Sequence, residues 1–220
     1  MKTLPLLLFS LLLPMPSHSQ SIQASGFIFD DPPTPQVHAS TIVETPEGLV
    51  AAWFAGEYER HPEVGIWVAR HENGAWSRPV EVATGIQPDG SSHPTWNPVL
   101  FQPASGPLML FYKVGPTPQS WWGMRIVSHD GGRSWSEPER LPDGVIGPVK
   151  NKPVVLSDGT VLSGSSTEHD GWRVHFERSH DGGQTWAPTD PVNDGETIGA
   201  IQPSILVHPD KKDENYKIMV

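Results

Sequence analysis

Short apolar stretches separated by turn residues recur along this chain. HASTIV, WNPVLF, NKPVVL and IQPSIL begin at His38, Trp96, Asn151 and Ile201. Each is followed by a turn rich in Gly, Pro or Asp and then by a second stretch, LVAAWFAG, LMLFYKVG, VLSGSS or YKIMV. Third stretches, VGIWVAR, MRIVSH and WRVHFERSH, follow in the first three units. Stretches of this length between turn signals are typical of β-strands, so the pattern predicts a repeated antiparallel sheet.

Two polar octets follow the third stretch of the second and third units, SHDGGRSW from Ser128 and SHDGGQTW from Ser179. A related but eroded copy, ARHENGAW, ends at Trp76. The tryptophans Trp76, Trp135 and Trp186 are 59 and then 51 residues apart. This period matches one four-stranded sheet with its turns, so the chain is predicted to repeat a single all-β unit.

The octets have two interpretations, a repeated reactive site or a repeated turn. The carboxylates of Asp130 and Asp181 can accept N–H groups of their own turns, the glycines supply positive φ, and Trp135 and Trp186 can cover the hairpins. Two equivalent reactive sites one sheet apart could not converge on a single substrate. We therefore expect Asp130, Trp135, Asp181 and Trp186 to be structural.

The composition agrees with many short elements. The chain has 24 Pro and 21 Gly, which disfavour long helices, while nine Trp and an apolar fraction of 36% are enough for a core. A net charge of −10, with no Lys/Arg run longer than Lys211-Lys212, argues against a nucleic-acid partner. Ten His occur without a metal-binding spacing, and no phosphate-binding glycine loop is present, so neither a metal nor another cofactor is expected.

The N-terminal segment MKTLPLLLFSLLLPMPSHSQ predicts export to the periplasm or secretion. An apolar run follows Lys2, and Ser17-His18-Ser19 has the form of a signal-peptidase site, so residues 1–19 are interpreted as a signal peptide. This run is too short for a membrane span, and no later segment is long and apolar enough for one. Residues 20–35, which contain several Pro, are interpreted as an extended lead-in.

The octet pattern S-x-D-x-G-x-[ST]-W resembles the Asp-box, or bacterial neuraminidase (BNR) repeat, of sialidase-like β-propellers. HASTIVETPEGLVAAWFAGE, TWNPVLF and GPVKNKPVVLSDGTVLSGSS are similar to the BNR-repeat branch of that family. The resemblance implies an all-β, sialidase-type six-bladed β-propeller, here incomplete, with about three and a half blades of four-stranded antiparallel sheet. The expected blades of this partial propeller, residues 36–220, are about 36–90, 91–145 and 146–195, with a fourth beginning at 196–220.

The sequence stops at YKIMV, inside an expected strand, and is therefore interpreted as truncated. Phe27-Ile28-Phe29 resembles the N-terminal strand that pairs with the last blade of such propellers. An unclosed sheet edge would favour aggregation, and little or no turnover is expected from the 220-residue chain.

Antiparallel connectivity sorts the polar residues to two ends of each sheet. The turn after the first strand and the octet share one end, and the entry to the first strand and the connection between the second and third strands share the other. That entry end collects long loops, aromatic side chains and unpaired charges, which on a rigid scaffold commonly bind ligands. The binding candidates there are Arg60, Trp96, Asn97, Lys150, Lys152 and Gln202.

These candidates have structural alternatives. Lys150 and Lys152 are two residues apart, so both can face one way and bind an anion, or they can be a pair of solvated lysines. Asn97 and Gln202 lie at strand entries and are expected to hydrogen-bond sugar hydroxyls near the central axis. Trp96 is expected to stack on sugar C–H groups, with packing between blades as the alternative.

Two catalytic candidates follow from the resemblance. Glu63 precedes VGIWVAR, where sialidase relatives place a general acid/base that is usually Asp, and Glu57 and Glu59 can raise its pKa by repulsion. A solvated acidic loop is the alternative. His38 falls where those relatives carry the first Arg of an R-I-P motif that binds the substrate carboxylate, and a His binds an anion less reliably. A buried structural His is the alternative.

The resemblance implies an exo-glycosidase, a sialidase-like glycoside hydrolase that removes a terminal, acidic sugar from a glycan. A non-catalytic glycan-binding propeller is the alternative favoured by the absent R-I-P motif. A third possibility is another carbohydrate reaction on this scaffold, at a uronate or a deoxysugar. Sialidase relatives use a Tyr nucleophile and a Glu from later blades, and neither can be assigned in this sequence.

Overall fold

The computed structural model describes residues 25–209 and 216–219, and every regular element in these segments is a β-strand. The expected signal peptide, the first residues of the lead-in and residues 210–215 lie outside the described part. Within that part, no helix has the length and apolar character needed to cross a membrane.

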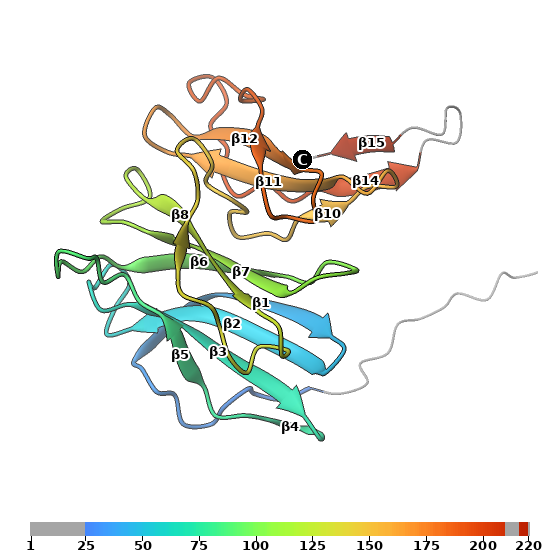
Figure 1. The fold of residues 1–220 in the computed structure, drawn as a ribbon. Helices are drawn as coiled ribbons and strands as arrows, with labels where there is room; N and C mark the ends of the chain where they lie inside the picture. The colour runs from blue at the N-terminus through green and yellow to red at the C-terminus, as the bar shows by residue number, and fades with distance from the viewer. Residues whose placement is uncertain (1–24, 210–215, 220) are drawn as a thin grey trace, which may run out of the picture.

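The strands form four antiparallel sheets in chain order (Figure 1). The first sheet contains β1 (Gln36–Thr45), β2 (Gly48–Gly56), β3 (Gly65–Glu72), β4 (Ala75–Trp76) and β5 (Val80–Ala83). The second contains β6 (Thr95–Phe101), β7 (Leu108–Val114), β8 (Trp122–Ser128) and β9 (Glu139–Arg140). The third contains β10 (Val154–Val155), β11 (Val161–Thr167), β12 (Arg173–Ser179) and β13 (Ala187–Pro188), and the fourth contains β14 (Leu206–Pro209) and β15 (Tyr216–Met219).

Each of the first three sheets is a meander that corresponds to one predicted unit, which confirms the repeated antiparallel architecture. The first strands of the last two sheets are shorter than expected. NKPVVL contains only the two-residue β10, and IQPSIL contributes only Leu206 to β14. Pro153 and Pro203 lie at these entries, and a proline cannot donate to a strand ladder.

The sheets pack face to face, and the apolar core lies between them (Figure 1). One cluster joins the first and second sheets and includes Phe54, Ile66 and Leu110. A second cluster joins the second and third sheets and includes Phe111 and Leu141. Because β7 is covered on both faces, it is buried along its whole length, which explains why LMLFYKV is nearly continuous rather than alternating.

The entry to each first strand contains a residue with left-handed backbone. The φ angles are 51° at Ala39, 40° at Asn97, 70° at Lys150 and 57° at Gln202. In the first two sheets the residue lies in a bulge that shifts the pairing register. Left-handed backbone costs a residue other than Gly roughly 1–2 kcal/mol, so the four entries share one strained geometry.

The contacts between sheets confirm the predicted sorting into two ends. At one end, Gly131 of the first octet lies so close to Glu47, in the β1–β2 turn, that a side chain at Gly131 would overlap it. At the other end, the Ser92 hydroxyl, ahead of β6, donates to the carbonyl of Pro62 in the β2–β3 connection at 2.7 Å. The octets therefore lie opposite the strand entries.

Candidate functional site

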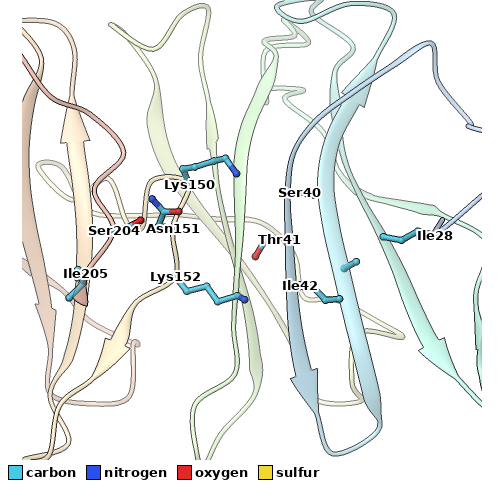
Figure 2. Close-up of a pocket in the computed structure, with 10 residues that line it drawn as sticks. Ile28, Ser40, Thr41, Ile42, Lys150, Asn151, Lys152, Ser204 and Ile205 are labelled. Carbon is cyan, nitrogen blue, oxygen red and sulfur yellow. The ribbon is translucent and has the colours of Figure 1, made fainter. Parts of the chain in front are cut away.

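An open pocket of about 540 Å³ lies where the strand entries of the first, third and fourth sheets approach one another. Its polar lining comes from Ser40, Thr41, Lys150, Asn151, Lys152 and Ser204, and its apolar lining from Ile28, Ile42, Ala51 and Ile205. Figure 2 shows both lysine side chains extending from the third sheet toward β1. The expectation that Lys150 and Lys152 face the same way is confirmed.

Hydrogen bonds of the backbone and of Asn151 place the two lysines. The N–H of Val149 donates to the carbonyl of Gly164 in β11 at 3.2 Å, and the N–H of Asn151 donates to the carbonyl of Val149 at 2.9 Å. The Asn151 side-chain amide then donates to the carbonyls of Gln202 (2.8 Å) and Pro203 (3.2 Å). Asn151 thereby ties the third sheet to the fourth, and the flanking lysines reach the pocket.

The pocket concentrates positive charge in an acidic chain. Among the described residues, no carboxylate forms an ion pair with Lys150 or Lys152. The formal net charge of the whole chain is −10, so the two amines are a local exception. Hydroxyls of Ser40, Thr41 and Ser204 line the same space. This arrangement suits a ligand that carries an anionic group together with hydroxyls.

His38 lies beside this pocket rather than in it. Its ring stacks on Phe54, with the ring centroids 5.4 Å apart, and lines a neighbouring pocket of about 420 Å³. Because His38 is exposed, the interpretation as a buried structural histidine does not apply.

Glu63 lies in the β2–β3 connection and is exposed. Its N–H donates to His61 Nδ1 at 3.2 Å, and the N–H of Val64 donates to the carbonyl of His61 at 3.0 Å, so the loop closes as a turn at this point. Glu63 does not line the lysine pocket, so the structure does not bring the expected acid/base and the expected anion contacts into one cavity.

Trp96 packs between the first two sheets. It is 3% exposed, contacts Phe54 and Trp121, and donates its Nε1–H to the carbonyl of Gly115 at 2.9 Å. Both the ring and its N–H therefore have protein partners. Trp96 adopts the structural alternative instead of presenting a face to a sugar.

Asn97, Gln202 and Arg60 lie at the predicted end but outside the lysine pocket. Asn97 is 8% exposed, Gln202 is half-buried, and the N–H of Gln202 donates to the Ser166 hydroxyl at 3.2 Å. Arg60 is exposed and has left-handed backbone, with φ at 79°. Of the predicted binding residues, the structure thus brings only the two lysines together in the pocket.

The first octet forms the predicted turn around Asp130. Its Oδ1 accepts the N–H groups of Arg133 (3.0 Å) and Ser134 (2.9 Å) and the hydroxyl of Ser128 (2.8 Å). Trp135 is half-buried and packs against the cluster between the first two sheets.

The second octet repeats this geometry around Asp181. Its Oδ1 accepts the N–H groups of Gln184 and Thr185, both at 2.9 Å. Trp186 packs against the cluster between the second and third sheets and donates Nε1–H to the carbonyl of Gly183 at 3.0 Å. The hydrogen bonds of the Asp130 and Asp181 carboxylates thus stay within their own turns, while Arg125 of β8 donates to the carbonyls of Gly183 and Gln184 in the second octet.

Sequence reasoning did not single out Ser40, Thr41, Ser204 or Glu168. The first three are polar positions inside the apolar stretches HASTIV and IQPSIL, and that interruption was the available signal. Glu168, in the β11–β12 connection, accepts a hydrogen bond from Gln119 Nε2 at 3.4 Å. Burial raises the pKa of Glu168, which is the direction that a proton donor requires.

The repeated sheets, the octet turns and the strand entries that meet at one pocket define a sialidase-like propeller protein. A family model described as BNR repeat-like domain matches residues 47–217, and the chain therefore belongs to this BNR-repeat family. A search of curated proteins found no match.

Several solved structures share the fold at low sequence identity. A Hadza microbial sialidase is 17% identical with a TM-score of 0.62, covering 73% of this chain and 38% of its own. The Trypanosoma rangeli sialidase is 17% identical with a TM-score of 0.54, covering 79% and 33%. A family 117 glycoside hydrolase from the marine bacterium Zobellia galactanivorans is 10% identical with a TM-score of 0.57, covering 80% and 60%. The chain spans less than two thirds of the length of each.

Proposed function

We propose that this chain belongs to an exported exo-glycosidase that removes a terminal acidic sugar from a glycan. The observation that carries the proposal is the pair Lys150 and Lys152, which line one open pocket with hydroxyl groups and have no carboxylate partner among the described residues. The likeness to sialidases and to a family 117 glycoside hydrolase supports a glycosidase-type scaffold.

In this proposal the lysine amines bind the sugar carboxylate through charge-assisted hydrogen bonds. The hydroxyls of Ser40, Thr41 and Ser204 bind sugar hydroxyls. Glycoside cleavage also needs a proton donor at the leaving oxygen. Glu63 is the candidate that the resemblance implies, and Glu168, whose pKa is raised by burial, is a second candidate, although neither lines the lysine pocket.

Binding and hydrolysis test the proposal separately. Titration of the chain with N-acetylneuraminate, glucuronate and glucose is expected to show binding of the two acids only. Because little or no turnover is expected from the 220-residue chain, hydrolysis of aryl glycosides of the same sugars is compared in the full-length enzyme, as wild type, Glu63→Gln and Glu168→Gln. Loss of hydrolysis with binding retained in one variant would identify the proton donor, because such a residue contributes about 10²–10⁴-fold to the rate. Equal affinity for glucose would contradict the proposal.

A non-hydrolytic glycan-binding propeller is the second candidate. It is favoured by His38, an exposed residue stacked on Phe54 where the resemblance would place a substrate-binding Arg. Acid-selective binding by the full-length protein, without hydrolysis of any aryl glycoside, would support this candidate over the first.

Export is also part of the proposal, and the sequence around Ser17-His18-Ser19 supports it. Expression with the complete N-terminus and sequencing of the mature protein should show a chain that begins at Gln20. A mature protein that retains residues 1–19 would contradict export by this signal.

A further inference from the structure

A segment between the second and third sheets is held by buried side chains from both. Glu177 in β12 accepts the N–H groups of Ile146 (2.7 Å) and Gly147 (2.8 Å), one on each carboxylate oxygen. Lys113 in β7 donates from Nζ to the carbonyl of Pro148 at 2.5 Å. Three consecutive residues thus form hydrogen bonds with side chains from two different sheets.

The contacts on this segment are made in a dry environment. Ser165 in β11 adds a hydrogen bond from its hydroxyl to the carbonyl of Gly147 at 3.0 Å, and Lys113, Ser165 and Glu177 are each 0% exposed. The second apolar cluster, which includes Phe111, lies between the same two sheets. Burying a charged group is costly unless it is well hydrogen-bonded, and a satisfied buried network favours one conformation. These side chains therefore specify the backbone of residues 146–149.

The segment leads directly into the lysine pocket. Gly147 has φ at 75°, and Lys150, the first residue after the segment, has φ at 70°. Downstream, Asn151 is tied to the fourth sheet through Gln202 and Pro203. The lysines thus lie on a short stretch that is fixed at both ends, and a change in residues 146–149 would move their amines.

We propose that Lys113 and Glu177 are positioning residues that fix residues 146–149 and thereby place Lys150 and Lys152 for the carboxylate of an acidic sugar. This inference rests on the proposed function. Neither positioning residue lines the pocket, and neither is exposed to a ligand, so both act through the backbone.

Two substitutions and one control test the inference. Glu177→Gln leaves one side-chain oxygen for two N–H donors, and Lys113→Met removes the donor to Pro148 at similar length. Trp67→Ala is the control, because Trp67 in β3 packs against a separate apolar cluster of the first sheet that contains no residue of 146–149, and its truncation should lower stability. Affinities of the full chain for N-acetylneuraminate and glucuronate are measured where circular dichroism shows folded protein.

Both positioning variants should lose tenfold or more in affinity, and Trp67→Ala less than twofold. Ser165→Ala, which removes one neutral hydrogen bond, should lose affinity to a smaller extent and serves if the charged variants do not fold. Unchanged affinity in folded Glu177→Gln, or in Ser165→Ala when that variant alone folds, would overturn the inference while leaving the proposed function intact.

If wild type binds neither sugar, the proposed function fails and a second measurement still tests the positioning. The lysine amines are labelled by reductive ¹³C-methylation, and the resonances of Lys150 and Lys152 are compared by NMR. Shifted resonances in Glu177→Gln or Ser165→Ala, with unshifted ones in Trp67→Ala, would support positioning through the backbone. Unshifted resonances in every variant would overturn it.

Discussion

The hydroxyl of Ser134 donates a hydrogen bond of 2.6 Å to Asp130 Oδ2, and Thr185 makes the same bond to Asp181 in the next octet. Hydrogen bonds from the hydroxyl and N–H of Ser134, and from the hydroxyl of Ser128, hold the pKa of Asp130 well below its usual range. Both carboxylates are therefore ionised and accept hydrogen bonds from groups of their own turns. The octets should affect stability and leave ligand binding unchanged.

Asp181→Ala should lower the free energy of unfolding by about 1–2 kcal/mol, because several turn N–H and hydroxyl groups lose their acceptor. Its affinity for N-acetylneuraminate should stay within twofold of wild type. Asp190→Ala is the matched control, since Asp190 is exposed and its carboxylate accepts no hydrogen bond among the described residues. Chemical denaturation and titration measure the two quantities. A large loss of affinity in folded Asp181→Ala would contradict a purely structural octet.

The stability contributed by Asp181 should depend on pH. Partial burial opposes its ionisation, but hydrogen bonds from Thr185, Ser179 and Gln184 prevail and lower its pKa to about 2. A lowered pKa contributes stability above the unfolded value near 4 and loses it as the pH falls toward 2. The difference in unfolding free energy between wild type and Asp181→Asn should therefore shrink from about pH 5 to about pH 2. A constant difference would contradict the lowered pKa.

Lys113 should also gain stability as the pH rises, but in a higher pH range than Asp181. Burial lowers its pKa to about 7, and the negative charge of Glu177 opposes this shift. Between about pH 7 and pH 10 the unfolded state then binds more protons, so stability rises with pH. Wild type should gain stability relative to Lys113→Met from about pH 6.5 to pH 9, with a slope of at most about 1.4 kcal/mol per pH unit.

His175 is the other titratable group near Glu177 on β12, with Nε2 3.3 Å from Glu177 Oε1. Repeating the pH series in a His175→Gln background removes this side chain from the comparison. A difference between wild type and Lys113→Met that does not change with pH in this background would contradict the buried titration.

Lys150→Met and Lys152→Met should each weaken binding of an acidic sugar about tenfold, because each removes a charge-assisted hydrogen bond. Glucose binding and thermal stability should not change. Arg78→Met is the charge-matched control, since Arg78 is exposed and lines a different pocket. Added salt should weaken binding to wild type more than to the double variant. Equal effects of Arg78→Met and Lys150→Met would point to the overall charge rather than to the pocket.

The fold could be predicted from sequence because its signals are local. Alternating and continuous apolar stretches mark the strands, and each octet carries its own acceptor, glycines and covering Trp within eight residues. The sequence does not predict which residue has the left-handed backbone at the entry of the third sheet. By analogy with Asn97 and Gln202, which precede prolines, Lys152 would occupy it, yet Lys150 does. This position follows residues 146–149, whose hydrogen-bond partners come from two neighbouring sheets.

Only part of the candidate site could be predicted from the sequence, because much of it depends on how the sheets pack and not on local signals. The common direction of Lys150 and Lys152 was predicted from strand alternation, but in the structure the two lysines lie on a turn, with φ of 70° at Lys150 and a hydrogen bond from the Asn151 N–H to the Val149 carbonyl. The burial of Trp96 depends on how the first two sheets pack, and Ser204 reaches the pocket only through the approach of the fourth sheet. Lys113 interrupts an apolar strand, which is a visible signal, but its acceptor lies 35 residues away.

The left-handed backbone at the four strand entries does not depend on which side chain stands there. Ala39, Asn97, Lys150 and Gln202 all have a positive φ, although they carry a methyl group, two amides and an amine. Of the four, only Lys150 lines the lysine pocket, so exchanging its side chain should alter ligand preference while the strand pairing stays the same. Such a scaffold can diversify toward new sugars by a single substitution at this position, without redesign of the sheets that support it.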